Sequence, residues 1–529
     1  MAGRALHGRG MSRSPACAML VLLALSGARA WAAALELEAA PPVTVAATVG
    51  PVGNWSPHLA TNGAGTWIAV WQAGVHPGFM NEPYVARSTD DGLTWSPPQR
   101  LAPGVARGSD FDRASPHIAT DRSGTWIVAW HAVPAEYIPG VQGNSDVFLA
   151  RSTDDGVTWT VTGRVDGSGG SQPTFTSDVY PDLASGIGGG WMVVWLSAGP
   201  YVGVDFPYPG IYRSRSSDGG ATWSAGVPLS DDTTNDPAEE YGPYVASDRH
   251  GTWLTGWYAI RGTYVGTKSF LLRSTDDGIT WSDRPAIDPF AGNAGGPRVS
   301  TDGNGFWIAL WDRVTGAMAA RSFDGGMTWT APETVAAPPV FTAPDVATSD
   351  DGTSLVVWNE HNTRWMSWSP RQPPQGIPWS APVVLSSTGR AFPVLSTARV
   401  ASDGRRTWVV AWEAADEAAE TTHIALARVA LVESPTIAEL ARRLVARFPD
   451  AQRGDRVAKS LARLGRKLVG QARRFDEQSG RRRRQASRLV RSLTQALLRK
   501  ARNAAAKDRL GVDLAAIEAA ATKLLDRLQ

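Results

Sequence analysis

The chain has 529 residues, more than one ordinary domain needs, and tryptophan is over-represented at 23 residues. With 54 glycines and 36 prolines, the composition indicates many short elements separated by turns. The net charge of +2 hides two opposed parts, because residues 434–529 hold 24 of the 52 Lys and Arg but only 9 of the 50 Asp and Glu. A basic tail behind an acidic body predicts two units with different partners. The single cysteine excludes a fold held by disulfides within the chain.

The N-terminus has the pattern of a secretory signal. Arg4, Arg9 and Arg13 form a basic start, residues 16–25 are apolar, and Ala28-Arg29-Ala30 offers a small-x-small cleavage site. We therefore expect residues 1–30 to be a signal peptide and the protein to be secreted or periplasmic. No later stretch has the length of a transmembrane helix, so no transmembrane segment is expected.

Two motifs then alternate along residues 31–433. The first is Pro-x-apolar-Ala, a polar turn with Gly, and Trp-x-x-x-Trp, and its second tryptophan recurs every 47 to 65 residues. The seven copies carry Trp67/Trp71, Trp126/Trp130, Trp191/Trp195, Trp253/Trp257, Trp307/Trp311, Ser354/Trp358 and Trp408/Trp412. A unit of this length repeated seven times is typical of the blades of a β-propeller.

The second motif, Ser-x-Asp-x-Gly-x-Thr-Trp, follows the first in each unit. Intact copies occupy residues 88–95, 152–159, 216–223, 274–281 and 322–329; the sixth copy, ending at Trp379, lacks the aspartate, and a seventh is absent. The aspartate can accept backbone N–H groups inside a tight turn, and the glycine two positions later supplies a positive φ. The two motifs together predict four strands per unit, which in the first unit are residues 57–61, 66–72, 84–88 and 95–101.

The last unit ends after its third strand, at residues 423–431. Residues 41–47 resemble the fourth-strand segment at residues 332–337, so an N-terminal strand is expected to close the last blade and to remove its open edge. The predicted fold is all-β: a seven-bladed β-propeller of four-stranded blades with Asp-box hairpins, plus a C-terminal α-helical tail at residues 434–529.

The Ser-x-Asp-x-Gly-x-Thr-Trp copies resemble the Asp boxes, or BNR repeats, of the sialidase (neuraminidase) superfamily over about residues 41–432. That resemblance implies a propeller, which in sialidases usually has six blades. It also implies three arginines for a substrate carboxylate, a tyrosine nucleophile with a glutamate, and an aspartate acid/base. Here Trp55 stands at the place of the first arginine, residues 341–344 contain no tyrosine, and Glu360 matches the family glutamate only weakly.

One position of the repeat varies between blades. The residue that follows the proline of the first strand is polar or ionisable, while its neighbours stay apolar or small. In chain order the seven residues are His58, His117, Asp182, Tyr244, Arg298, Asp345 and, at the equivalent place, Arg399. Variation at one place in a regular repeat predicts a ligand-binding surface at the mouth of the central channel. The alternative is that these residues pair among themselves and line a wet channel.

Further candidates for catalysis are Glu240 with Tyr241, before the fourth blade, and Asp110 with Asp112, before the second. All four are equally compatible with solvated loop positions. The arginines that precede the boxes recur identically and are expected to be structural; they are Arg87, Arg151, Arg273 and Arg321. No His, Cys or carboxylate spacing suggests a metal site, and neither a metal nor a cofactor is expected.

From Ser434 the pattern becomes helical, with expected helices ending before Pro449 and at about residues 455–478, 485–507 and 512–528. This tail is interpreted as a small helical bundle with a basic face, or as an attachment to an anionic envelope surface. Two functions stay open for the propeller. It binds a glycan or glycoconjugate, or another ligand such as a protein, at the mouth of the central channel, or it is a glycoside hydrolase of exo-α-sialidase type with a rearranged site. Nucleic acid is not an expected partner, because the chain carries an export signal.

Overall fold

The computed structural model describes most of the repeat region and most of the tail. The described residues are 35–45, 53–74, 81–103, 106–107, 115–134, 145–165, 177–198, 210–229, 238–261, 267–282, 295–313, 316–336, 344–360, 363–372, 379–387, 398–416, 421–433, 437–446, 456–477, 480–505, 514–526 and 528. They form two compact units, one within residues 37–431 and one mainly of residues 432–529. The predicted signal peptide, Asp110, Asp112 and residues 341–343 lie outside the described residues.

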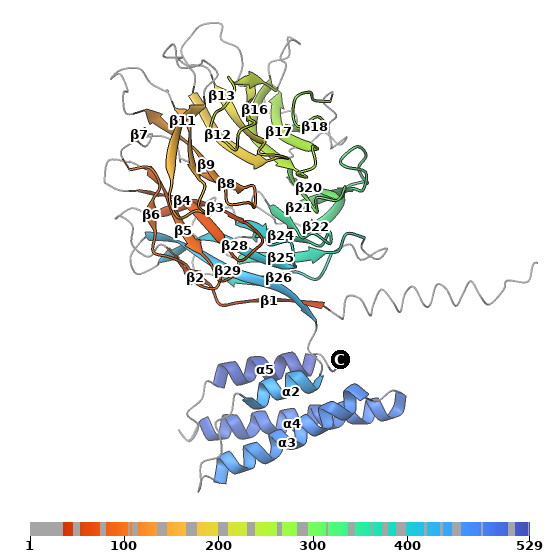
Figure 1. The fold of residues 1–529 in the computed structure, drawn as a ribbon. Coiled ribbons are helices and arrows are strands. Elements are labelled where there is room, and N and C mark those ends of the chain that lie inside the picture. Colours follow the sequence, from red (N-terminus) through yellow and green to blue (C-terminus); the bar gives the residue numbers. More distant parts are fainter. Residues whose placement is uncertain are drawn as a thin grey trace, which may run out of the picture. The chain divides into compact units, whose positions relative to one another are not determined.

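Seven antiparallel sheets are arranged around one axis and form a seven-bladed propeller, as predicted (Figure 1). The first three blades contain β3 (Asn54–Thr61), β4 (Trp67–Gly74), β5 (Asn81–Ser88) and β6 (Gln99–Arg100); β7 (Ala106–Arg107), β8 (His117–Thr120), β9 (Trp126–Pro134), β10 (Asp146–Ser152) and β11 (Thr160–Val165); and β12 (Ser177–Ser185), β13 (Trp191–Ala198), β14 (Gly210–Ser216) and β15 (Val227–Pro228). In each blade the strand that contains the variable position is called strand A, and the tryptophan-rich strand that follows it is called strand B.

The other four blades continue the pattern. They contain β16 (Ala238–Ser247), β17 (Trp253–Arg261) and β18 (Thr267–Ser274); β19 (Arg298–Thr301), β20 (Trp307–Arg313), β21 (Gly316–Ser322) and β22 (Glu333–Ala336); β23 (Asp345–Thr348), β24 (Ser354–Glu360), β25 (Thr363–Ser369) and β26 (Val383–Ser387); and β27 (Arg399–Ser402), β28 (Thr407–Asp416) and β29 (Thr421–Glu433). In its described part the fourth blade has three strands.

The N-terminal segment closes the last blade, as predicted. In β2 (Val43–Thr44), Val43 lies opposite Leu426 and Thr44 opposite Ala425 of β29. A second N-terminal strand, β1 (Leu35–Ala39), also pairs with β29 and was not predicted from the sequence. The closing contact joins the two ends of the repeat region and covers the edge of β29 in the described part of the last blade.

The tryptophan pairs form the core between neighbouring blades. Trp67 and Trp71 of the first blade pack with residues of the seventh, and Ile68 on the opposite face of the same strand packs with Trp126 of the second. Twelve tryptophans are almost wholly buried: Trp67, Trp71, Trp126, Trp130, Trp191, Trp195, Trp253, Trp257, Trp307, Trp311, Trp408 and Trp412. A strand covered on both faces needs apolar residues at every position, which explains why these strands do not alternate.

Each intact Asp box closes its hairpin with the same set of hydrogen bonds. In the first box, one oxygen of the Asp90 carboxylate accepts the N–H of Thr94 at 2.9 Å and the other accepts the Thr94 hydroxyl at 2.6 Å. The Ser88 hydroxyl accepts the N–H of Gly92, whose φ of 78° requires the glycine. The box is therefore a folding device at the outer end of each blade, called the rim below.

The arginines before the boxes join neighbouring blades, which confirms their structural role. Arg87 of the first blade donates from Nε to the carbonyl oxygen of Asp155, in the box of the second, at 2.8 Å. Arg151 and Arg273 donate in the same way, at 2.7 Å, to Gly219 and Gly325 in the boxes of the following blades. These three boxes thus each supply a carbonyl acceptor to the blade before them.

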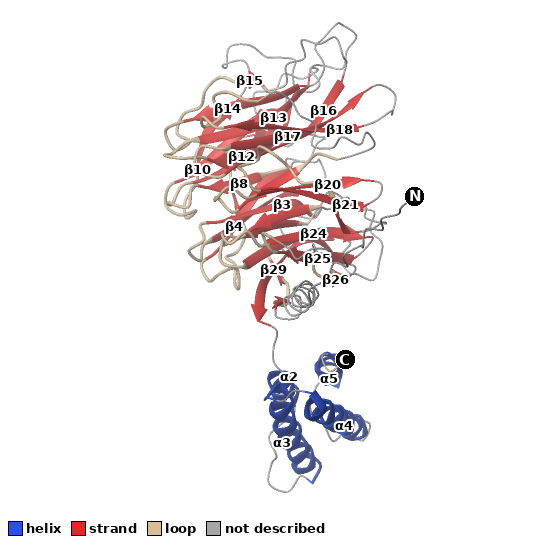
Figure 2. Cartoon of the chain, turned by 90° about the vertical axis from the view of Figure 1, so that its right-hand side faces the viewer, coloured by secondary structure: helices blue, strands red, loops and turns tan. Residues whose placement is uncertain are grey.

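The tail is helical, and Figure 2 shows its helices in blue. It contains α2 (Ile437–Ala446), α3 (Arg456–Glu477), α4 (Gly480–Ala505) and α5 (Leu514–Asp526). Their apolar faces share a core that includes Leu444, Leu468, Val490, Ile517 and Leu524. Among the described helices, none combines the length and the apolar character needed to cross a lipid bilayer.

Candidate functional site on the propeller axis

A β-bulge in strand A directs the variable residue toward the axis. The pairing register shifts between Trp55 and His58 in the first blade, and at the same place in the third and fourth blades. The bulge residue Ser56 has a φ of 51°, and its N–H is held by the Glu413 carboxylate of the preceding blade at 2.8 Å. Bulges commonly re-aim a side chain beside a functional site. Here the bulge sets the direction of the residue that follows it.

The seven predicted ligand-binding residues all lie on the innermost strands, in β3, β8, β12, β16, β19, β23 and β27. His58 and His117 stack with ring centroids 4.3 Å apart. The charges of Arg298 and Arg399 act on the pKa of both histidines, although these arginines come from the fifth and seventh blades. The structure therefore brings the variable position of different blades together on the axis, and we call this set the axial ring.

The best-defined pair in the axial ring joins two blades. His117 Nδ1 lies 2.7 Å from Asp182 Oδ1, and both side chains are largely buried. Burial lowers the pKa of His117 more than Asp182 raises it, so the imidazole is neutral at neutral pH. Burial alone would raise the pKa of Asp182, but His117 and the charge of Arg298 hold it below its usual value. A carboxylate on Nδ1 fixes the imidazole so that Nε2 is the free acceptor.

The cationic side of the axial ring contains Arg298 and Arg399. The Arg298 guanidinium lies 5.2 Å from the centroid of the Tyr244 ring, a cation–π distance. Burial and the charge of Arg298 lower the pKa of Arg399 to about 10, and the buried Nη1 of Arg399 has no hydrogen-bond partner among the described residues. The Asp345 carboxylate accepts the N–H of Val400 at 2.9 Å. The ring therefore offers an unpaired guanidinium donor to a ligand.

Tyr244 serves mainly as a neutral donor. Its hydroxyl donates to the carbonyl oxygen of Val299 in the next blade at 2.5 Å. Burial, with Asp182 and Asp345 nearby, raises its pKa far above the ordinary value, which disfavours a phenolate nucleophile.

His58, His117 and Asp182 form a group of three potential metal ligands, whose ligand atoms all lie within 4.8 Å of one another. Their lone pairs already have partners, however. His58 Nδ1 accepts the N–H of Ile118 at 3.3 Å, and the two Asp182 oxygens accept the N–H groups of Leu183 and Val245, both at 2.9 Å. A metal would have to displace several of these bonds, so the geometry fits interblade pairing better than coordination.

The candidates Glu240 and Tyr241 lie in β16 before the bulge that precedes Tyr244. Tyr241 stacks on Tyr258 with centroids 5.6 Å apart, and Glu240 is buried. Near Tyr258 lies Asp312, whose pKa is raised by burial. Neither Tyr258 nor Asp312 was identified from the sequence.

A signal for the last two residues was present in the repeat. Both directly follow the second tryptophan of a blade, a position that is polar in six of seven blades: Gln72, His131, Tyr258, Asp312, Asn359 and Glu413, with Leu196 in the third. Three of these side chains accept the N–H of the bulge residue in the next blade, as Gln72 does from Ser115 and His131 does from Tyr180. The residue after the second tryptophan therefore varies between blades, and in three blades it also holds the bulge that precedes the variable residue of the next blade.

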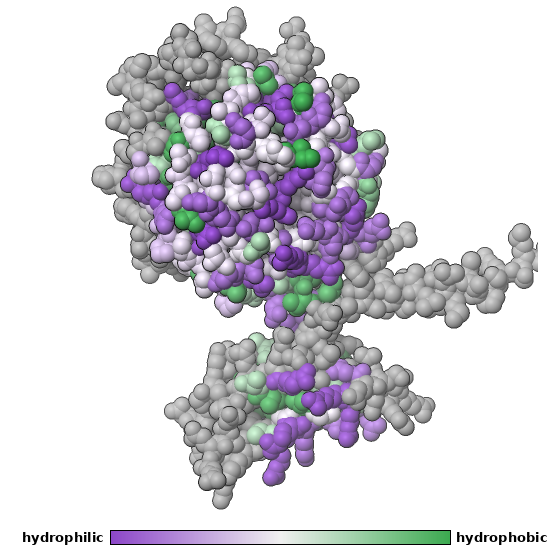
Figure 3. All heavy atoms as spheres, viewed as in Figure 1, coloured by the Kyte–Doolittle hydropathy of each residue, from purple (hydrophilic) through white to green (hydrophobic). Residues whose placement is uncertain are grey.

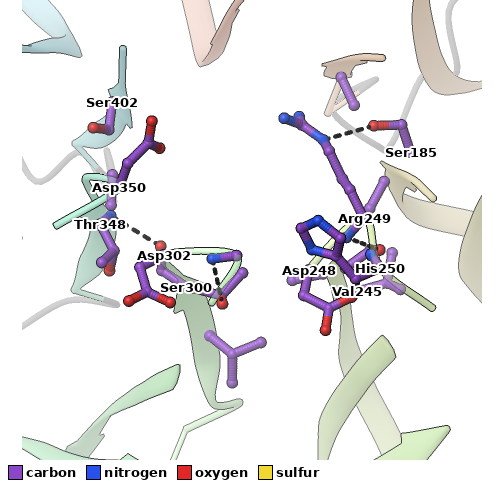
Figure 4. A pocket seen from close by; sticks show the side chains of 18 of the residues that line it. Ser185, Val245, Asp248, Arg249, His250, Ser300, Asp302, Thr348, Asp350 and Ser402 are labelled. Carbon is purple, nitrogen blue, oxygen red and sulfur yellow. Dashed lines mark hydrogen bonds between the residues drawn. The ribbon is translucent and has the colours of Figure 1, made fainter. Parts of the chain in front are cut away.

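A pocket of about 560 Å³ opens at the end of the axis where strands A and B are joined (Figure 4). Its wall is formed by the A–B turns and adjoining strand ends of several blades, and Tyr244 belongs both to this wall and to the axial ring. Arg249, His250, Asp302 and Asp350 are among the lining residues. We call it the turn pocket; the sequence analysis did not predict it.

Comparison with known proteins gives one family. Residues 192–408 match the BNR repeat-like domain. No curated protein matches the chain. Similar solved structures include a Hadza microbial sialidase, with 13% identity over 74% of this chain and 95% of that chain and a TM-score of 0.43. A Penicillium chrysogenum alpha-L-arabinanase complexed with arabinobiose has 15% identity over 75% and 99%, with a TM-score of 0.42. An ulvan lyase has 13% identity over 73% and 95%, with a TM-score of 0.47.

Proposed function

We propose that this chain, an Asp-box β-propeller of the sialidase superfamily, is an exported protein that binds a glycan or glycoconjugate at its axial ring. The observation that carries the proposal is the convergence of unlike polar side chains from successive blades on one axis. Residues that the fold needs in every blade recur along the repeat, so a position whose residue varies between blades is available for ligand recognition.

The chemistry of the axial ring suits a polyhydroxylated ligand. Neutral His117, held by Asp182, presents an acceptor, while Arg298 and Arg399 present charged donors in a partly buried setting. Alternating donors and acceptors against the Tyr244 and imidazole rings can match sugar hydroxyls and the apolar face of a pyranose.

The alternative is a glycoside hydrolase of exo-α-sialidase type with a rearranged site. Such an enzyme needs a protonated carboxyl group as its acid. Asp182 is held ionised by its surroundings, whereas the pKa of Asp312 is raised, so Asp312 is the carboxyl group best suited to that role. Glu240, Tyr241, Asp110 and Asp112 stay candidates for the remaining roles.

The test is a glycan array probed with the full chain, together with turnover of a fluorogenic sialoside. We expect glycan binding that Arg399→Ala and Arg298→Ala each weaken by about tenfold or more, since hydrogen bonds to a charged group contribute roughly 1.5–3 kcal/mol. Arg164→Ala is the matched control, because Arg164 pairs with Asp146 on a partly exposed outer strand. If neither Arg399→Ala nor Arg298→Ala weakens glycan binding, the proposal is overturned. If the wild type hydrolyses the sialoside and Arg298→Ala abolishes this turnover, the protein is a hydrolase.

We also propose that the tail attaches the protein to an anionic envelope surface. Helix α4 contains no Asp or Glu, and Arg463, Arg466 and Lys467 are exposed on α3. In Figure 3 hydrophilic side chains cover much of the described surface of the tail. Sedimentation with anionic lipid vesicles should be strong at low salt and lost at high salt, and equal binding to neutral vesicles would refute the attachment.

A further inference from the structure

The A–B turns of the propeller contain one position with left-handed backbone. Glycine occupies it in the first, fifth and seventh blades, at Gly63, Gly303 and Gly404, with φ between 72° and 83°. The second and fourth blades have Arg122 and Arg249 there, with φ of 62° and 61°. A residue with a Cβ pays about 1 kcal/mol for this conformation, so arginine at a glycine position indicates a use for the side chain.

Both arginines line the turn pocket. Arg249 donates from Nε to the Ser185 hydroxyl at 3.3 Å and from Nη2 to the carbonyl oxygen of Thr120 at 3.1 Å. Both acceptors are neutral, and no carboxylate lies within ion-pair distance of Arg249 in the part of the chain that the structure describes. Burial and the charge of Arg122 lower the pKa of Arg249 to about 10, which still leaves it charged at neutral pH.

The acidic residues around the pocket are largely committed to the turns. Asp248 accepts the N–H groups of His250 and Thr252, at 2.7 and 2.9 Å. Asp302 accepts backbone N–H groups in its own turn and pairs with Arg371 at 2.7 Å. Asp350 is exposed at the mouth of the pocket, 3.9 Å from Arg122. The negative charges of Asp121 and Asp350 act on Arg249, but neither forms an ion pair with it among the described residues.

The remaining wall is rich in hydroxyl groups. Figure 4 shows Ser300, Thr348 and Ser402 on the side of the pocket opposite Arg249 and Ser185. The volume of about 560 Å³ lies in the range of small-molecule sites, which span roughly 300–1,000 Å³. Guanidinium groups recognise carboxylate, phosphate and sulfate through paired N–H donors.

We propose that the turn pocket is a second binding site, which binds a small oxyanion through Arg249, with Arg122 as a further donor at the mouth of the pocket. The anion is a carboxylate, such as that of an acidic monosaccharide, or an inorganic phosphate or sulfate. The proposal does not depend on glycan binding at the axial ring, because Arg249 and Arg122 are not part of that ring, although Tyr244 lines both sites.

The experiment is calorimetric titration of the full chain with glucuronate, phosphate and sulfate as separate probes. At least one anion should bind at millimolar concentration, and the strongest identifies the source. Arg249→Gly should raise its Kd at least about tenfold, because a charge-assisted pair is lost. Glycine suits the left-handed backbone, which offsets part of the loss of the hydrogen bonds to Ser185 and Thr120, so the variant should remain folded. Arg249→Lys keeps the charge without the paired donors and should weaken binding less than Arg249→Gly.

Two controls make the result specific. Arg406→Gly is matched to Arg249→Gly, because Arg406 has a φ of 66° and bonds to Asp351 outside the turn pocket; its Kd should be unchanged. Arg399→Ala tests the axial ring and should also leave the Kd unchanged. The site is disproved if none of the three anions binds, if Arg249→Gly binds as the wild type does, or if Arg399→Ala alone abolishes binding.

Discussion

The rim and the axis of the propeller use the repeat in opposite ways. At the rim, Ser, Asp, Gly and Thr recur unchanged in five boxes and make the same hydrogen bonds within each blade. On the axis, the variable position of strand A carries seven residues of four types, and their bonds run between blades, as in His117 with Asp182. Identity along a repeat therefore marks local folding, and diversity marks contacts between blades and with a ligand.

The sixth blade differs from the first five at the rim. Its box has lost the aspartate, yet Arg321 of the fifth blade is retained and finds new acceptors. It pairs with Glu333 at 2.7 Å and donates to the Ser369 hydroxyl and the Pro370 carbonyl oxygen, with its guanidinium 5.2 Å from the centroid of the Trp379 ring. Among the described residues, the joint between these blades thus depends on a different set of acceptors from the box carbonyl oxygens that Arg87, Arg151 and Arg273 use.

Removing Arg321 should have the largest effect on stability. Its side chain is 3% exposed, so Arg321→Ala leaves the partly buried Glu333 carboxylate with the Trp379 indole N–H but without its cationic partner, and should lower the free energy of unfolding by about 3 kcal/mol. Arg87→Ala is the matched control: Arg87 is 27% exposed, and we expect a loss of about 1 kcal/mol. Denaturant unfolding of both variants measures the difference. Equal losses would show that the substituted joint is no more critical than an intact one.

A smaller effect is expected at the aspartate that links two intact boxes. Asp155 accepts Trp126 Nε1 at 3.0 Å within its own blade, and the Thr66 hydroxyl at 2.7 Å and Arg87 Nη2 at 3.2 Å from the blade before. Asp155→Gly should cost about 2 kcal/mol, because a buried indole N–H loses its acceptor. The third and fifth boxes already have glycine at this place, at Gly219 and Gly325, so the backbone tolerates it.

Asp91→Gly in the first box is the control for that variant. Asp91 has the same left-handed backbone, with a φ of 59° against 60° for Asp155, but it is exposed. Its loss should change the free energy of unfolding by less than about 0.5 kcal/mol. If thermal unfolding shows the two variants to be alike, then the aspartate acts through its own turn and not through the contact between blades.

The sequence predicted the rim and the blade count well, because both follow from residues that recur at fixed spacing. It also identified which residues of strand A are variable, but not which of them meet. His117 and Asp182 are 65 residues apart and lie in different blades, so their pairing depends on the tilt of whole sheets. The sequence shows which residues occupy equivalent positions of the repeat, but it does not show which of them are close to one another across the axis.

The turn pocket was missed for a different reason. Its signal, arginine at a place where other blades have glycine, is legible in the sequence at Arg122 and Arg249. The meaning depends on the sign of φ, which the turn adopts only once strands A and B are paired. Likewise, the residue after the second tryptophan is visibly polar, but its role in holding the next blade's bulge appears only in the structure.

The smallest predicted effect on stability concerns His131, a buried histidine beside the axial ring. Burial, with the nearby His117, lowers the pKa of His131 from 6.5 to about 3. Because the folded pKa lies below the unfolded one, its contribution to stability is present above pH 6.5 and is lost as the pH falls from 6.5 toward 3. Between pH 7 and 5.5 the wild type should therefore lose about 1 kcal/mol through this residue.

His131→Gln isolates that contribution. His131 Nδ1 accepts the N–H of Tyr180. A glutamine makes the equivalent hydrogen bond in the first blade, where Gln72 Oε1 accepts the N–H of Ser115. The variant should keep the contact and lose the titration, so its unfolding free energy should fall less than that of the wild type between pH 7 and 5.5. If the unfolding free energies of the two proteins fall in parallel with pH, then His131 is protonated in the folded state at little cost. The histidine would then be accessible to water, which its burial in the structure argues against.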